Sequence, residues 1–194
     1  MAEYNIWATK IGEYFAESNE IKNSALDIFN NPPELPNSTG YDYNYNIFSS
    51  TTQENIFLKW IFSKCIDYCS DINQKQNFKI TRGWAISLKY GNSNDFHTHG
   101  YTHLAAVYYI NADRTIHPDL EIIDPRPPHI LSRVTRNSNT TFDESHVSSG
   151  LITYKVPAET GKLVIMPGYL AHGVMTNMSD VPRICIAMNI DILQ

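Results

Sequence analysis

The chain has 194 residues and a formal net charge of −5, and 42% of its residues are hydrophobic while 18% are charged. This length and composition fit one globular domain with a sizeable core and exclude an intrinsically disordered chain. The 15 lysine and arginine residues are scattered, so no basic run is present to neutralise a nucleic-acid backbone, and we expect no nucleic-acid partner.

The N-terminal residues and the cysteines indicate where the protein works. No basic segment followed by an apolar stretch opens the chain, which predicts no signal peptide. No apolar run approaches the roughly 20 residues that span a bilayer, so we expect no membrane partner. The odd number of cysteines (Cys65, Cys69 and Cys185) suits a reducing compartment better than a disulfide framework. We therefore predict a cytoplasmic location.

Two helices are predicted in the first part of the chain. Glu20–Phe29 has an amphipathic pattern, and a polar, turn-rich loop over residues 30–50 follows it. Thr51 and Glu54 can form a capping box that opens the second helix. The apolar residues after this box follow helical spacing and predict one buried face, made of Phe57, Trp60, Ile61, Cys65, Tyr68, Cys69 and Ile72.

From residue 77 the hydrophobic period changes from helical to two, which is typical of strands. Several short strands after two helices predict a single, mainly β domain, with a jelly roll or barrel over residues 77–194 and a helical support region, residues 1–76, packed outside it. Residues 125–150 are long and polar, as in functional lids or disordered loops. The predicted strands are Phe78–Tyr90, Leu104–Ile110, Leu120–Ile123, Leu151–Val156, Leu163–Met166 and Arg183–Ile192.

Three of the seven histidines have a spacing that suits metal binding. His97 and His99 come just before a predicted strand, and in an extended segment they point to the same face because side-chain direction repeats every two residues. His172 follows a Pro-Gly turn at the end of another strand and offers a third ligand. The spacing alone leaves open a structural pair of histidines without a metal.

Arg183 opens an otherwise apolar strand eleven residues after His172. A guanidinium is a planar fork that matches a carboxylate, so the residue is suited to binding a small anion. The alternative is an ordinary ion pair with a neighbouring carboxylate such as Asp180.

The order and spacing of these four residues resemble the signature of 2-oxoglutarate/Fe(II) dioxygenases, which is His-x-Asp/Glu, a later His, and an Arg about ten residues further on. His97–Tyr109 resembles, without a gap, the core HxHPxSxLSGxYY of an oxygenase subfamily in bacterial and phage proteins. Asp124-Pro125-Arg126 resembles its DPR motif, and Gly161–His172 resembles its GxLxxFPxxLxH motif. The resemblance covers roughly residues 80–192.

For the metal, the resemblance implies a double-stranded β-helix in which His97, His99 and His172 hold Fe(II). Position 99 departs from the common signature, because the usual facial triad is two histidines and one carboxylate. Three imidazoles would leave the iron more positive, and Asp95 or Asp124 remains an alternative source of a carboxylate. Further departures are Gly100 in place of Pro and Ala105-Ala106 in place of Ser-Gly.

For the co-substrate, the resemblance implies that 2-oxoglutarate and dioxygen bind the iron. Arg183 would pair with the distal carboxylate of 2-oxoglutarate. Tyr109 has the strand parity to help it, and the alternative for this residue is an ordinary strand aromatic. Asn189 lies on the Arg183 face of its strand, whereas Tyr108 has the opposite parity and is expected to pack. The implied reaction converts 2-oxoglutarate into succinate and carbon dioxide and hydroxylates an unidentified small-molecule or protein substrate.

Other residues near these motifs have simpler interpretations. His103 has the parity of His99 and is either a partner of a ligand or a core histidine. His117, which lies in a polar loop, is expected to be solvated, as are His129 and His146. Trp84 is expected in the core. The charges of Asp124 and Arg126 either pair with each other or leave Arg126 to meet an anionic substrate.

Two other functional classes remain open from the sequence. A cupin-type metalloprotein that does not use 2-oxoglutarate would need the histidines but not Arg183. A non-enzymatic jelly-roll module for binding or structure would need neither. The sequence does not indicate the oligomeric state.

Overall fold

The computed structural model describes residues 9–31, 47–49, 51–52, 54–71, 76–126, 147–148 and 151–193. Ile72, His129, His146 and most of the two predicted loops, 30–50 and 125–150, lie outside the described residues, so their predictions stay untested.

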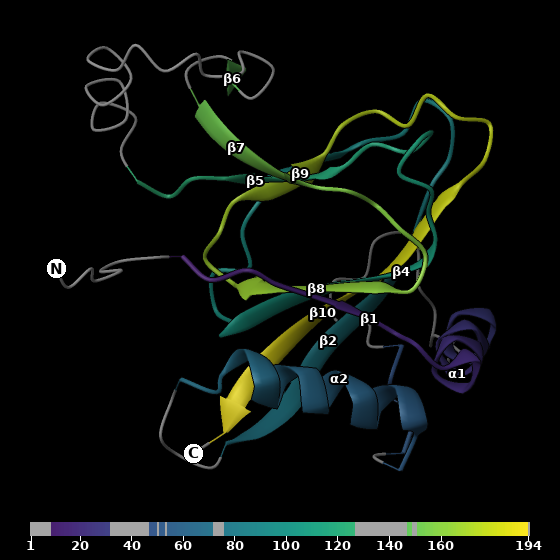
Figure 1. Ribbon diagram of the computed structural model, residues 1–194, viewed down its shortest axis with the longest axis vertical. Coiled ribbons are helices and arrows are strands. Elements are labelled where there is room, and N and C mark those ends of the chain that lie inside the picture. The colour runs from purple at the N-terminus through teal and green to yellow at the C-terminus, as the bar shows by residue number, and fades with distance from the viewer. Residues whose placement is uncertain are drawn as a thin grey trace, which may run out of the picture.

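Two antiparallel five-stranded sheets lie face to face (Figure 1). The predicted mainly β jelly roll with outer helices is confirmed. The first sheet has the order β1 (Gly12–Phe15), β8 (Lys162–Pro167), β4 (Leu104–Asn111), β10 (Arg183–Leu193) and β2 (Asn77–Leu88). The second has the order β3 (Asn94–His97), β9 (His172–Val174), β5 (Leu120–Ile123), β7 (Leu151–Val156) and β6 (Val147–Ser148).

Both helices, α1 (Asn19–Asn30) and α2 (Ile56–Tyr68), pack on the outer face of the first sheet (Figure 1). The ring centroid of Phe57 on α2 lies 4.8 Å from that of Tyr108 on β4 in an edge-to-face contact. Tyr108 therefore packs in this outer core, as its parity predicts. Trp60 is only half-buried and borders the same core.

The predicted capping box of the second helix is wrong. The helix begins at Ile56, and its N-cap is Asn55, whose side-chain oxygen accepts hydrogen bonds from the backbone N–H groups of Phe57 (2.9 Å) and Leu58 (3.2 Å). Asparagine is among the best N-cap residues because its oxygen satisfies N–H groups that the helix leaves unpaired. Glu54 instead forms an exposed ion pair with Lys59.

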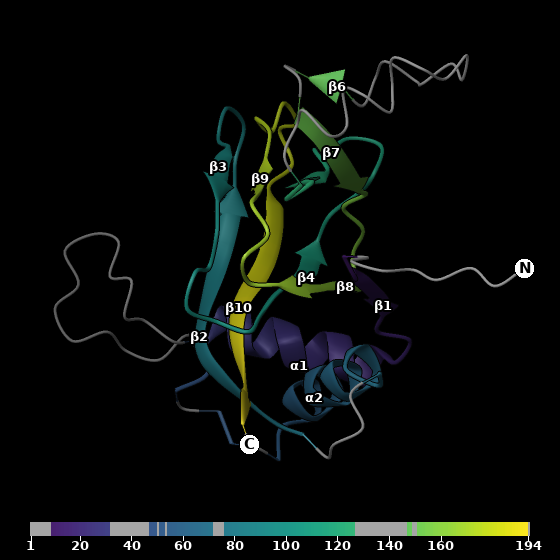
Figure 2. The same cartoon turned by 90° about the vertical axis from the view of Figure 1, so that its left-hand side faces the viewer.

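Strands β2 and β10 are the long central pair that positions the site, and they run side by side (Figure 2). Even-numbered residues of β10 such as Ile186 face the helices, so the odd-numbered residues from Arg183 to Asn189 face the second sheet. On β2, Trp84 lies opposite Ala187 and shares this inner face. A second core fills the space between the sheets and includes Tyr109 and Cys185.

Several strands differ from the predicted set. β2 ends at Leu88 rather than Tyr90, because a turn with Gly91 at φ 80° follows. β1 comes from the region predicted to be helical and pairs with β8, so this region contributes to the first sheet. Within the part of the chain that the structure describes, neither helix has the length and apolar character needed to cross a bilayer.

Candidate metal centre

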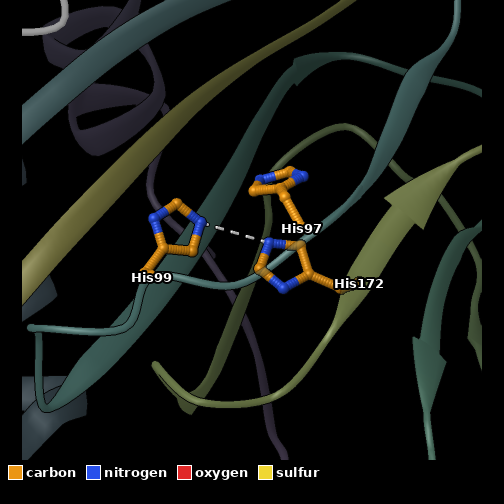
Figure 3. A group of neighbouring side chains, drawn as sticks. All are labelled: His97, His99 and His172. Atoms are coloured by element: carbon orange, nitrogen blue, oxygen red, sulfur yellow. Dashed lines mark hydrogen bonds between the residues drawn. The ribbon is translucent and has the colours of Figure 1, made fainter.

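The three predicted histidines converge on one point between the sheets (Figure 3). His97 is the last residue of β3 and pairs across the sheet with His172, the first residue of β9. His99 follows β3 by two residues. One ring nitrogen from each residue lies within 4.8 Å of the other two. The side chains therefore form a cluster that can bind a metal ion.

The spacing of two ring nitrogens matches that of neighbouring ligands on one ion. Nε2 of His99 lies 3.3 Å from Nε2 of His172. Two nitrogens that each lie about 2.1 Å from one ion are about 3.0 Å apart at a right angle and about 3.4 Å apart at the tetrahedral angle. The observed distance falls between these values, so an ion can bind both rings with little movement.

Two of the rings are oriented by backbone carbonyls. Nδ1 of His97 lies 2.7 Å from the carbonyl oxygen of Asp95, and Nδ1 of His172 lies 2.9 Å from that of Leu170. A carbonyl only accepts, so each Nδ1 carries the proton and donates it. Each Nε2 then keeps a free lone pair, which is the form in which imidazole binds a metal.

The surroundings of His99 and His172 keep these two rings neutral. Burial lowers the pKa of His99 to about 4, helped by the neighbouring His172 and His97, while the side chain of Asn189 has a smaller opposite effect. Burial likewise lowers the pKa of His172 to about 4. At neutral pH both rings are therefore unprotonated at one nitrogen and available to a cation.

Close backbone packing holds the two histidine segments together. The backbone N–H of His99 donates to the carbonyl of Gly168 at 2.8 Å, and the N–H of Gly168 donates to the carbonyl of His103 at 3.0 Å. A Cβ at position 168 would lie 2.3 Å from the carbonyl oxygen of Thr102. Only glycine permits this approach, which brings the loop of His99 against the loop that leads to His172.

Neither aspartate considered as a ligand belongs to the cluster. Asp124 forms an ion pair with Arg126, whose Nε lies 2.8 Å from the carboxylate, and the hydrogen bonds from Arg126 lower the pKa of this carboxyl. Of the two predicted roles for these charges, mutual pairing is confirmed. Asp95 is exposed and offers its backbone carbonyl to His97 instead. The donor set in the described residues is three imidazoles.

Arg183 is a buried cation without a counter-ion among the described residues. Its side chain is 1% exposed, and it forms no ion pair with any carboxylate of the described residues, Asp180 included. Nη2 donates to the hydroxyl of Tyr109 at 3.2 Å, and Nη1 lies 3.8 Å from Sγ of Cys185. In the part of the chain that the structure describes, the buried Nε has no hydrogen-bond partner. A buried charge without a counter-ion is strongly unfavourable. The guanidinium is therefore placed to bind a carboxylate that the described residues do not supply.

Tyr109 supports Arg183 from the inner face of β4. The guanidinium carbon lies 4.8 Å from the ring centroid of Tyr109, a cation–π contact. Burial raises the pKa of Tyr109 well above its usual value, although Arg183 opposes this effect. The hydroxyl therefore keeps its proton, accepts a hydrogen bond from Arg183 and can donate one to an anion.

Three other sequence predictions need correction. Trp84 belongs to neither core; it is half-buried, and its ring centroid lies 5.9 Å from that of His99. His103 is exposed and bonds to Asp191 rather than lying in the core. His117 is buried, not solvated, because one ring nitrogen accepts from the N–H of Asp113 and the other donates to the carbonyl of Val181.

Comparison with protein families matches residues 82–189, more than half of the chain, to the family described as "Putative 2OG-Fe(II) oxygenase". No curated protein is similar enough to match. The matched range begins before Trp84 and ends at Asn189, so it contains the whole histidine cluster and Arg183.

Solved structures share the fold at low sequence identity. HygX of Streptomyces hygroscopicus, solved with nickel and 2-oxoglutarate bound, has a TM-score of 0.57 at 14% identity and covers 94% of this chain and 82% of its own. The epimerase SnoN from nogalamycin biosynthesis has a TM-score of 0.59 at 11% identity, with coverages of 94% and 76%. A prolyl-4-hydroxylase of Pseudomonas putida has a TM-score of 0.51 at 11% identity, with coverages of 94% and 89%.

Proposed function

We propose that this chain, which belongs to the 2OG-Fe(II) oxygenase family, holds its Fe(II) through His97, His99 and His172 and its 2-oxoglutarate through Arg183. One observation carries the proposal. Among the described residues, a buried guanidinium has no counter-ion, and it lies on the inner face of the same sheets that bring three imidazoles together.

The three imidazoles fit Fe(II) by their chemistry. Borderline nitrogen ligands suit this ion, and a set of three leaves coordination positions open for a chelating co-substrate. The set of three imidazoles carries no charge, whereas a triad with one carboxylate carries one negative charge. Each negative charge of the co-substrate therefore contributes more to the charge balance of this centre. The residues proposed to bind this anion, Arg183 and Tyr109, matter more for the same reason.

The anion-binding residues act on 2-oxoglutarate by position and charge. The fork of Arg183 would bind the distal carboxylate through two charge-assisted hydrogen bonds, and the hydroxyl of Tyr109 would donate a third. Asn189 would add a polar group to the lining of the same inner face. Bound Fe(II) and 2-oxoglutarate supply the activation of dioxygen, with release of succinate and carbon dioxide. The protein binds, orients and excludes water.

Hydroxylation of the substrate is part of the proposal. The prolyl-4-hydroxylase of P. putida shares the fold, but so does the epimerase SnoN, so the fold alone leaves the outcome of the oxidation open. A small-molecule substrate and a protein side chain both remain candidates. A cytoplasmic location is also proposed, on the support of three buried cysteines that are free.

Succinate formation tests the proposed function. Protein reconstituted with Fe(II) under nitrogen and then exposed to air should convert 2-oxoglutarate into succinate slowly without substrate and faster with a substrate from a panel. His97→Ala should abolish this conversion. Iron binding without succinate formation would favour the cupin-type alternative, and a wild-type protein that binds no metal would favour the non-enzymatic module.

A further inference from the structure

The ring of His99 lacks the backbone support that the other two rings have. His97 and His172 each donate Nδ1–H to a carbonyl two residues earlier in the chain. In the described part of the chain, no backbone carbonyl does this for His99. Its Nε2 points at His172, and Figure 3 shows its second ring nitrogen on the side of the β10 ribbon, away from His172.

Asn189 on β10 offers the missing acceptor. It is half-buried on the inner face, and its side-chain oxygen is buried without a hydrogen-bond partner among the described residues. An unsatisfied buried amide oxygen is uncommon and calls for a donor nearby. The Asn189 side chain also lies close enough to the ring of His99 to interact with it.

Trp84 places His99 beside the same part of the first sheet. On the inner face of β2, Trp84 pairs with Ala187, the inner-face neighbour of Asn189 along β10. The ring of Trp84 lies 5.9 Å from that of His99 at an interplanar angle of 43°. The indole therefore packs against the imidazole, next to the part of β10 that carries Asn189.

We propose that Asn189 is the positioning residue for His99, accepting the Nδ1–H so that Nε2 presents its lone pair to the metal. The inference rests on the proposed function, because it takes His99 as a ligand. A neutral imidazole has one ring proton, which must lie on Nδ1 when Nε2 binds a metal. Because the ring is half-buried, this proton needs an acceptor, and the amide oxygen of Asn189 is placed to be one.

The hydrogen bond also partly compensates for the histidine at position 99, where the common signature has a carboxylate. A ring that donates its second N–H to an acceptor becomes a stronger metal ligand, and loss of such an acceptor commonly lowers metal affinity about 10- to 100-fold. At a site without a carboxylate ligand, Asn189 would give His99 part of the donor strength that a charged ligand has.

Zinc affinity measured by calorimetry tests the inference independently of catalysis. Asn189→Leu should weaken Zn²⁺ binding about 10- to 100-fold. Asn189→Asp should restore the affinity because its carboxylate can accept the same hydrogen bond. The matched control is Asn111→Leu, since Asn111 lies on the neighbouring strand and bonds to the carbonyl of Pro182 instead; its affinity should stay at the wild-type value.

The outcomes separate this inference from the proposed function. Wild-type protein that binds no Zn²⁺, or His97→Ala that binds it normally, overturns both. Wild-type affinity in Asn189→Leu overturns only the role of Asn189. Zn²⁺ affinity that is lost in Asn189→Asp as well as in Asn189→Leu would also contradict the role of Asn189 as a hydrogen-bond acceptor.

Nuclear magnetic resonance of the zinc-loaded wild-type protein gives a second test that needs no variant. Long-range ¹H–¹⁵N spectra should show His99 protonated at Nδ1, with a slowly exchanging proton and a nuclear Overhauser effect to the Asn189 side chain. A rapidly exchanging Nδ1 proton, or one without this contact, would contradict the proposal even if Asn189→Leu fails to fold.

Discussion

His97 and His172 face each other across the β3–β9 pair, with ring centroids 4.6 Å apart. Both strands are short, with four and three residues, so few backbone hydrogen bonds join them. A metal ion bound to both rings would link these strands directly.

Metal binding should therefore stabilise the folded protein. A ligand that binds only the native state at 100 times its dissociation constant adds about 2.7 kcal/mol. We expect Zn²⁺ or anaerobic Fe(II) to raise the unfolding temperature of the wild-type protein by several degrees in differential scanning fluorimetry. His172→Ala should show no such rise, and an equal rise in this variant would place the metal elsewhere.

Arg183→Leu should raise the KM for 2-oxoglutarate by two orders of magnitude or more, because truncating a buried charged partner costs roughly 3–5 kcal/mol. The same variant should be at least as stable as the wild type in urea without 2-oxoglutarate, because it removes a buried charge that no carboxylate of the described residues pairs with. Arg114→Leu, at an exposed arginine, is the control for both measurements. An unchanged KM would support a metalloprotein that does not use 2-oxoglutarate.

Stability without metal should depend on pH in the mildly acidic range. The pKa values of His99 and His172 are about 4 in the folded protein, below the ordinary 6.5. Between these values the unfolded chain takes up protons that the folded protein does not, so the free energy of unfolding falls as the pH drops from about 6.5 to 4. Urea unfolding at several pH values measures this slope.

Comparison with a variant that lacks one of these histidines separates their contribution from that of other titrating groups. His99→Gln should lose less stability than the wild type over the same pH interval, because one of the two lowered pKa values is gone. Equal slopes in the two proteins would contradict neutral, buried rings in the folded state.

Gly168→Ala should disrupt the metal centre through the backbone. Its Cβ would lie 2.3 Å from the carbonyl oxygen of Thr102, so the loop that carries His99 must move. We expect lower metal affinity and a lower free energy of unfolding. Gly100→Ala in the same loop is the control, since nothing lies within 4 Å of its Cβ and both properties should persist. A Gly168→Ala protein with full metal affinity would show that this close packing is dispensable.

The sequence predicted those site residues whose side-chain direction follows from the local alternation of a strand. His97 and His99 share a face through their two-residue spacing, and the alternation in β10 places Arg183 inside the sheets. The β9 strand was missed because its three residues are extended through pairing with β3 and β5, not through their own pattern.

Contacts between residues far apart in the chain explain the other misses. His117 is buried because the carbonyl of Val181, 64 positions away, accepts its ring N–H. The position of Trp84 against His99 and the free amide oxygen of Asn189 likewise depend on how β2 and β10 pair. The pattern of a single segment carries no information on such contacts.

Anaerobic titration of the Fe(II)-loaded protein with 2-oxoglutarate, followed by visible absorption, tests the central claim most directly. Chelation of the iron by the keto acid should produce a charge-transfer band that saturates at one 2-oxoglutarate per chain in the wild type and is absent in His172→Ala. A wild-type protein that holds one Fe(II) per chain but develops no band at saturating 2-oxoglutarate would contradict the account.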